Sequence, residues 1–194
     1  DYMLLNLPRR VTKPAVISVA QDARKAWRTV AREAADIGTA VHAAIETYLK
    51  TGKEPKITGD AAENAFLAYL EWENQHHIDP IYVEKTVYST GYAGTADLIC
   101  HKDGIPTLVD FKSAKGHFPE YALQTAAYRQ AWNHMSMSDP HEVIVEAHGV
   151  LRLDKVTGMP EYRDHSEKYE RDIRAFECLR EFWYLMREEQ NNGK

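Results

Sequence analysis

Two carboxylates and a lysine, in neighbouring hydrophobic stretches, are the residues of this chain best suited to chemistry. Asp97 closes the sequence GTAD, and Asp110 opens the sequence DFK thirteen positions later. Paired carboxylates hold a hard divalent cation such as Mg²⁺ or Mn²⁺. Lys112 is two positions from Asp110, hence on the same face of a strand, where its ammonium group can reach a phosphate or an attacking water. The pattern predicts metal-dependent cleavage of phosphodiester bonds, although aspartates at strand ends are also common turn residues.

A histidine adds a third candidate ligand. His42 and Glu46 lie one helical turn apart in a stretch with helical periodicity. An imidazole can complete a coordination sphere begun by two aspartates, and it favours Mn²⁺ beside Mg²⁺. Glu46 can orient that histidine or contribute through a water. The alternative for both residues is a solvated helix face.

Three further polar residues follow the DFK sequence. Gln124 and Tyr128 share one face of an expected helix, where an amide and a phenol can hydrogen-bond the catalytic strand or a phosphate. A core tyrosine beside an exposed glutamine is the alternative. Lys115 is a candidate contact to the DNA backbone, or an ordinary exposed lysine.

The charge of the chain is unevenly distributed. The net charge is −5, but the segment from Arg9 to Arg32 holds seven cations and one acid. Within it, the cations expected to form a phosphate-binding patch are Arg24, Lys25, Arg28 and Arg32. A solvated helix face is equally compatible with this block. No apolar run reaches the ~20 residues of a membrane span, so no membrane contact is expected. Two cysteines, too few for a zinc or iron–sulfur site, favour a reducing, intracellular setting.

The elements that must position these residues follow from periodicity and from glycine and proline punctuation. An α/β fold with a central mixed sheet flanked by helices is expected. Helices are expected over residues 18–35, 38–51, 60–76, 119–134 and 162–189, and strands over residues 81–88, 95–101, 105–113 and 143–153, with a hairpin turn at 102–104. Residues 1–17 are expected to be irregular. The apolar residues of the last helix, from Tyr169 to Met186, are expected on its buried side. One domain is expected over 1–194, with a basic helical segment (1–37), a catalytic core (38–156) and a C-terminal helix (157–194).

Four short motifs in a fixed order together resemble a known family. They are GTAVH at 38–42, GTAD at 94–97, DFK at 110–112 and QTAAY at 124–128. This series resembles the RecB-like branch of the PD-(D/E)xK nuclease superfamily and spans nearly half of the chain. The resemblance implies a restriction-endonuclease-like core. It also implies that the metal ligands are His42, Asp97, Asp110 and the backbone carbonyl of Phe111, with Lys112 as the catalytic lysine.

The resemblance also implies roles for residues around the site and indicates which members of the family are most similar. It makes Gln124 and Tyr128 the family's QxxxY motif, near the active site and DNA, and Glu84 a neighbour of the site. Ala96 stands where the superfamily name has proline, which this branch often lacks. The four cysteines that hold an iron–sulfur cluster in some members are absent from the sequence, so no cluster is expected. The implied relatives are exonucleases of phage recombination or mitochondrial DNA maintenance.

The sequence therefore predicts a Mg²⁺- or Mn²⁺-dependent DNA nuclease. An exonuclease acting on DNA ends or single strands in recombination, repair or DNA processing is the leading hypothesis, with a recombination or helicase protein as a partner. A nucleic-acid-binding module that keeps the fold without turnover is one alternative, and a metal-dependent enzyme with another substrate is a second.

Overall fold

The computed structural model describes residues 13–137 and 139–192 and divides the chain into two compact units, residues 1–39 and 40–194. Helix α1 (Lys13–Thr51) is continuous where two helices were expected, and it includes residues 13–17, which were expected to be irregular. Pro14 fits the first turn, where a missing N–H costs nothing. Gly38 is tolerated because alanines, the strongest helix formers, surround it. The expectation for residues 1–12 lies outside the described residues.

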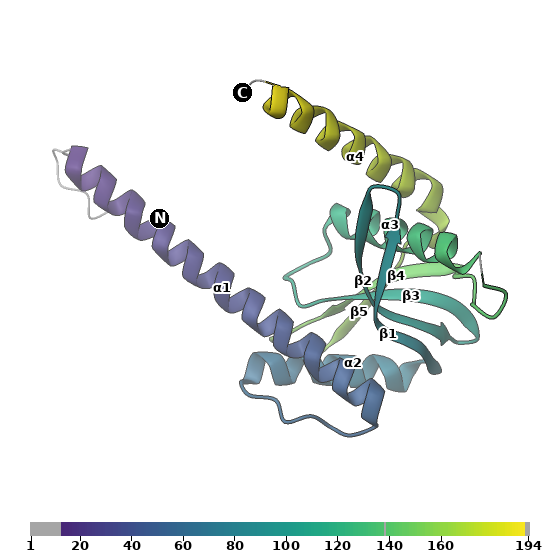
Figure 1. Ribbon diagram of the computed structural model, residues 1–194. Coiled ribbons are helices and arrows are strands. Elements are labelled where there is room, and N and C mark those ends of the chain that lie inside the picture. The colour runs from purple at the N-terminus through teal and green to yellow at the C-terminus, as the bar shows by residue number, and fades with distance from the viewer. Residues whose placement is uncertain (1–12, 138, 193–194) are drawn as a thin grey trace. The chain divides into compact units, whose positions relative to one another are not determined.

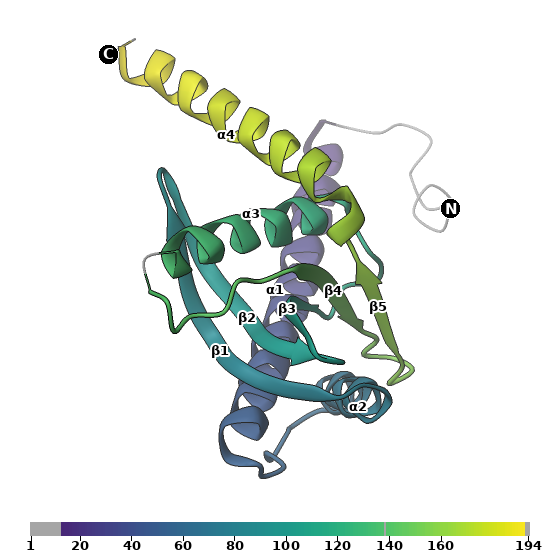
Figure 2. The ribbon, with the colours of Figure 1, turned by 90° about the vertical axis from the view of Figure 1, so that its right-hand side faces the viewer.

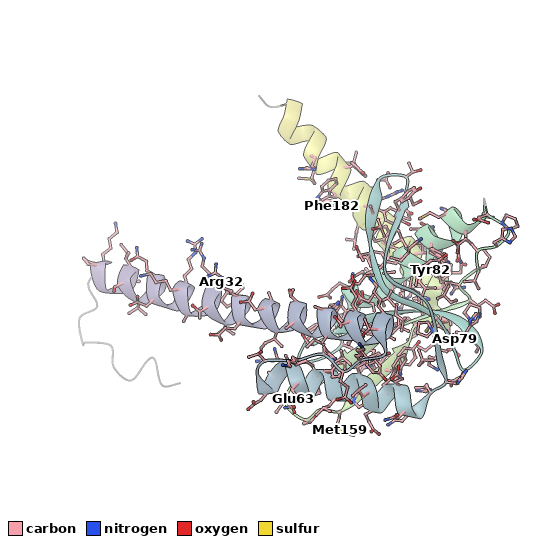
Figure 3. The ribbon with its side chains drawn as sticks, turned by 60° about the horizontal axis from the view of Figure 1, so that its bottom comes forward. Arg32, Glu63, Asp79, Tyr82, Met159 and Phe182 are labelled. Carbon is pink, nitrogen blue, oxygen red and sulfur yellow. The ribbon has the colours of Figure 1, made fainter. Side chains whose placement is uncertain are left out.

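In the first unit, residues 16–36 of α1 are exposed, and Ile37 and Gly38 are half-buried. The cations Arg24, Lys25, Arg28 and Arg32 are all exposed, and their spacing places them on one side of the helix. Figure 3 shows the Arg32 side chain projecting from the ribbon. The basic block is therefore a solvated helix face in this unit, available to a ligand.

A five-stranded mixed sheet forms the centre of the second unit (Figure 1). Its strands are β1 (Ile78–Ser89), β2 (Tyr92–Lys102), β3 (Ile105–Lys112), β4 (Ala147–Leu153) and β5 (Pro160–Asp164), in that spatial order. Neighbouring strands are antiparallel except β3 and β4, which are parallel and joined through α3 (Pro119–Ser136). The expected fold class, α/β with a mixed sheet flanked by helices, is confirmed.

The β2–β3 hairpin brings the two aspartates of the sequence motifs together. Asp103 and Gly104 both have positive φ, 52° and 84°, as a two-residue type I′ turn requires. The turn fixes the register, in which Leu98 pairs with Val109. The next residues along each strand, Asp97 and Asp110, are thereby placed side by side at the open end of the hairpin.

Helices α2 (Asp60–Gln75) and α3 cover opposite faces of the sheet (Figure 2). On the α3 face, Trp132 packs against Tyr82, with ring centroids 5.1 Å apart. On the α2 face, Tyr69 lies edge-on to Phe111 of β3 at 5.6 Å. The end of α1 joins this layer, because the Tyr48 hydroxyl donates to Glu73 of α2. The parts of β2 and β3 that carry Asp97 and Asp110 therefore belong to a sheet with a helix packed on each face.

Two expected elements differ near the C-terminus. Residues 143–146 are not part of β4, because side chains of α3 take their backbone hydrogen bonds: Asn133 Oδ1 accepts from the Val145 N–H, and Trp132 donates to the Val143 carbonyl. Residues expected to begin a helix form β5 and a 3₁₀ turn (Ser166–Lys168) instead, and α4 spans Tyr169–Asn192.

The apolar side of α4 is only partly buried, contrary to expectation. Ile173 is buried, and Phe176 packs against Tyr92 at 4.9 Å. Farther along, the exposed side chains include Leu179, Phe182, Trp183 and Met186, and Figure 3 shows Phe182 on this part of the helix. Arg180 and Tyr184 still reach the β1–β2 turn, where they donate to the Thr90 and Gly91 carbonyls, but the apolar side chains around them are left largely uncovered by the described residues. No described helix is long and apolar enough to cross a membrane.

Buried His148 predicts a pH dependence of stability. It is 0% exposed on β4, and burial together with the nearby Arg129 charge lowers its pKa to about 4. In the unfolded chain the pKa of a histidine is about 6.5. Between about pH 6.5 and pH 4 the unfolded state therefore binds more protons than the folded state. The free energy of unfolding falls as the pH falls through this range, by up to roughly 3 kcal/mol. Urea unfolding at pH 7 and 4.5 measures this. We expect His148→Gln to lose this part of the slope and His141→Gln, at an exposed histidine, to keep it.

Candidate metal centre

Three side chains from three elements form a group able to hold a metal ion. His42 of α1, Glu84 of β1 and Asp97 of β2 each offer one ligand atom, and these atoms lie within 4.8 Å of one another. His42 Nδ1 is 3.4 Å from Asp97 Oδ1 and 3.7 Å from Glu84 Oε1. Asp97 is buried, whereas His42 and Glu84 are half-buried. The group therefore combines a rigid carboxylate with access from solvent.

The dimensions of this group suit a small divalent cation. Two ligands of Mg²⁺, each at about 2.1 Å, lie at most ~4.2 Å apart. The 4.8 Å limit of the group exceeds this by a few tenths of an ångström, which ordinary side-chain adjustment supplies. Two carboxylates suit Mg²⁺ and Mn²⁺, and the imidazole favours Mn²⁺.

The backbone of Phe111 holds two members of the group in place. Its N–H donates to Asp97 Oδ2 at 2.7 Å, and its carbonyl lies 3.1 Å from His42 Nε2. A ring N–H bonded to a carbonyl is the usual way in which a metal-binding histidine is oriented, because it leaves the other ring nitrogen for the ligand. The resemblance makes the same Phe111 carbonyl a metal ligand, and that role stays a prediction.

Glu84 reaches the group through a strained backbone. Its φ of 55° lies in the left-handed region, which costs a non-glycine residue of order 1–3 kcal/mol. The β1–β2 register is the same on both sides of Glu84, with Val83 opposite Leu98 and Lys85 opposite Ala96, so Glu84 lies across from Asp97. This strand pairing brings the two carboxylates together. Strain of this kind concentrates at functional sites.

Asp110 and Lys112 form an ion pair beside the group. Asp110 is 1% exposed, and its Oδ2 lies 2.6 Å from Lys112 Nζ. A buried carboxylate needs such a counter-charge, so the ammonium rather than the three-residue group is its nearest partner. Asp110 is not a member of the three-residue group, whereas Glu84, expected as a neighbour of the site, is a member; a ligand role for Asp110 stays a prediction.

The charges of the site shift several pKa values. Burial alone lowers the pKa of His42, but Asp97, Asp110 and Glu84 outweigh it and raise this pKa to about 9. Burial and the Asp97 charge raise the pKa of Asp110 and also that of Glu84. Burial lowers the pKa of Lys112, yet Asp110 and Asp97 outweigh it and raise the value. The carboxylates of the site therefore favour positive charge there.

The other expected site residues are not members of the three-residue group. Glu46 bonds with Lys50 at 2.5 Å rather than with His42. Lys115 is exposed in the loop after β3. The cations at 24, 25, 28 and 32 belong to the first unit, outside the unit that contains the centre.

The glutamine and tyrosine of α3 are brought together as expected, next to a residue that was not singled out. Gln124 Nε2 donates to the Tyr128 hydroxyl at 3.0 Å. One turn earlier, the ring of Tyr121 lies 5.2 Å from Lys112 Nζ. Tyr121, Gln124 and Tyr128 follow helical spacing, and this periodicity is the signal that could have identified Tyr121.

Gly94 of the GTAD motif lies against the ring of Tyr128 of the QTAAY motif. A Cβ atom added at Gly94 would lie 2.4 Å from the Tyr128 ring, so Gly94→Ala must displace that ring. We expect a loss of about 1–3 kcal/mol in the free energy of unfolding, the usual cost of overpacking. Gly116→Ala, where nothing lies within 4 Å, is the matched control in urea unfolding. Equal stability of both variants would show that Tyr128 does not pack against this strand.

No protein-family model matches the sequence, and no curated protein matches it.

Proposed function

We propose that this protein is a metal-dependent DNA nuclease, with the restriction-endonuclease-like core of the RecB-like branch of PD-(D/E)xK nucleases in its second unit. The support is the convergence of His42, Glu84 and Asp97 on one point beside an Asp110–Lys112 ion pair. Carboxylates that crowd together at a half-buried point repel one another. A divalent cation relieves that repulsion, and the chain retains a strained Glu84 backbone that adds to the cluster.

The proposed reaction is hydrolysis of a phosphodiester bond. A bound Mg²⁺ or Mn²⁺ supplies Lewis acidity and a water of lowered pKa. His42, Glu84 and Asp97 hold the cation, and the Phe111 backbone keeps two of them oriented. This division between holding and orienting residues makes the geometry rigid before substrate arrives.

Lys112 acts as a cation in this proposal. Because its pKa is raised by Asp110 and Asp97, it carries a full positive charge at neutral pH. It stabilises the negative charge that grows on the phosphoryl oxygens, rather than removing a proton from water. Tyr121 beneath the ammonium group fixes the direction of the side chain.

Contacts to the DNA backbone are assigned to cations and polar groups of both units. Lys115 lies in the loop that follows β3, and Gln124 and Tyr128 lie one turn apart on α3. The exposed cations of the first unit, from Arg24 to Arg32, provide a further phosphate-binding surface. Such local positive surfaces let an acidic protein bind DNA.

The function is tested with end-labelled DNA, single- and double-stranded, linear and circular. We expect cleavage with Mn²⁺ or Mg²⁺ and none in EDTA. An exonuclease degrades linear substrates and leaves circles intact. Cleavage in EDTA contradicts the metal mechanism. Binding without cleavage in either metal identifies a DNA-binding module instead, and cleavage of RNA or nucleotides alone identifies another substrate class.

A further inference from the structure

A pocket of about 490 Å³ lies between α3, α4 and the start of β2, all in the second unit. Its lining is largely apolar and aromatic, and includes Tyr92, Leu123, Tyr128, Phe176, Leu179 and Trp183. The tip of the β1–β2 hairpin lies beside α4 here (Figure 2), because the Tyr184 hydroxyl donates to the Gly91 carbonyl. Two lining side chains are open to solvent, with Trp183 49% and Leu179 58% exposed. Apolar surface gathered from three elements around one pocket indicates a binding site.

Two aromatic side chains form a fixed inner wall of the pocket. Phe176 packs edge-on against Tyr92, with ring centroids 4.9 Å apart. The Tyr92 hydroxyl donates to the Ala127 carbonyl at 3.1 Å and to Gln130 Oε1 at 2.8 Å. The other two rings, of Trp183 on α4 and Tyr128 on α3, are only partly covered by the described residues. A flat aromatic ligand in the pocket would replace water at these rings.

The charged side chains of the lining favour a neutral ligand over a phosphate. Arg180 and Glu120 are the cation and the acid among the lining residues. Arg180 is paired with Glu177 and also donates to the Thr90 carbonyl, whereas exposed Glu120 repels an anion. The Glu120 carboxylate and the Gln124 amide oxygen can accept hydrogen bonds from the N–H groups at the edge of a nucleobase. The lining therefore suits a flat, neutral ring with donors at its edge.

A further cation lies one helical turn beyond the pocket. Arg187 follows Trp183 on the same face of α4, and its guanidinium carbon lies 4.3 Å from the centre of the Trp183 ring. Proteins bind single-stranded nucleic acids with this combination, because bases stack on aromatic rings while cations meet the phosphates. The pocket supplies the rings, and Arg187 supplies a positive charge outside it.

Two regular elements connect the pocket to the metal centre. On α3, Tyr128 follows Tyr121, whose ring lies 5.2 Å from Lys112 Nζ, by two turns, which is ~10.5 Å along the helix. On β2, Gly94 lies against the Tyr128 ring and precedes Asp97 on the same strand, by ~10 Å at the usual rise of a strand. At the ~3.4 Å spacing of stacked nucleotides, either distance corresponds to about three nucleotides.

We propose that this pocket takes up one unstacked base of a single-stranded nucleic acid, held against Trp183 and Tyr128. That the strand is the substrate of the metal centre rests on the proposed function. A base of an intact duplex must be unpaired before it can enter, so the pocket selects single strands and frayed ends. It holds the strand about three nucleotides from the metal centre.

Strands with and without bases separate stacking from phosphate contacts. A labelled deoxythymidine strand and an abasic strand of the same length are titrated in EDTA at several salt concentrations. Trp183→Ala should bind the intact strand about 5- to 150-fold more weakly, the effect of one lost base–aromatic stack. It should bind the abasic strand as the wild type does, with the same salt slope, because no charge is removed. Trp183→Phe, which keeps a ring, should retain most of the affinity.

The matched control is Phe182→Ala. Phe182 is the neighbouring aromatic residue of α4, is 62% exposed and is not among the residues that line the pocket, so this variant should bind both strands as the wild type does. Wild-type affinity of folded Trp183→Ala for the intact strand overturns the proposal. An equal loss for both strands also overturns it, and so does a wild type that binds neither. A dimer in sedimentation that Trp183→Ala converts to a monomer shows that a second copy covers the pocket instead.

The outcome for the pocket is distinguishable from the outcome for nuclease activity. If the wild type cleaves no DNA but Trp183→Ala loses affinity for the intact strand alone, the nuclease proposal fails and the base pocket stands. If the wild type cleaves single strands and Trp183→Ala binds the intact strand unchanged, the base pocket fails and the nuclease proposal stands.

Discussion

Asp97→Asn is expected to reduce metal-dependent DNA cleavage by at least ~10³-fold, because it removes a negative ligand of an ion that contributes several kcal/mol to catalysis. Asparagine keeps an oxygen that can accept the Phe111 N–H, which now bonds to Asp97 Oδ2. The fold should therefore survive, with unfolding in urea close to that of the wild type. Calorimetric titration with Mn²⁺ should show the matching loss of affinity.

The control for this variant is Asp79→Asn. Asp79 is also an aspartate of the sheet, but its side chain is 69% exposed, and its Oδ2 lies 3.7 Å from His101 Nδ1. This variant should keep both Mn²⁺ affinity and cleavage. Undiminished cleavage by folded Asp97→Asn would show that Asp97 does not hold a catalytic metal ion.

Lys112→Ala should separate binding from chemistry. The charge on the phosphoryl group grows as water attacks, so the ammonium group matters more in the transition state than in the ground state. Under single-turnover conditions with saturating DNA, we expect a loss of roughly 10²–10³-fold in rate, the scale of one lost stabilising group. Mn²⁺ affinity should remain, because Lys112 is not among the ligand atoms.

Two further variants define the role of Lys112. Lys112→Arg should not restore the rate. The planar guanidinium is bulkier than the compact ammonium group, so it cannot occupy the position 2.6 Å from the Asp110 carboxylate with the same geometry. Lys53→Ala, at an exposed lysine, should leave the rate unchanged. A wild-type rate for Lys112→Ala would make Lys112 a structural partner of Asp110 and nothing more.

The sequence is sufficient to predict the local framework of the centre. The Asp103–Gly104 turn fixes the hairpin, and period-two alternation fixes which residues share a face, so the proximity of Asp97 and Asp110 follows from local rules. The side-by-side placement of Gln124 and Tyr128 follows from helical spacing in the same way. These features depend on residues close together in sequence.

Features that depend on tertiary packing were not predictable in this way. The left-handed backbone of Glu84 is unfavourable for its residue type. The neighbouring sequence therefore does not predict it. Asp110 turns to Lys112 because of burial, which sequence does not give. The charged strand β5 is a short edge strand, without the apolar alternation of an inner one. The periodicity of α4 shows which side is apolar but not how much of that side is covered.

The proposed cation between His42, Glu84 and Asp97 is tested most directly by anomalous diffraction from crystals of the protein grown with Mn²⁺. The account predicts one strong anomalous peak with ligand atoms of all three residues at roughly 2.0–2.5 Å, and no peak there in crystals of Asp97→Asn. A fully ordered site without a peak, or a peak held by other residues, would contradict it.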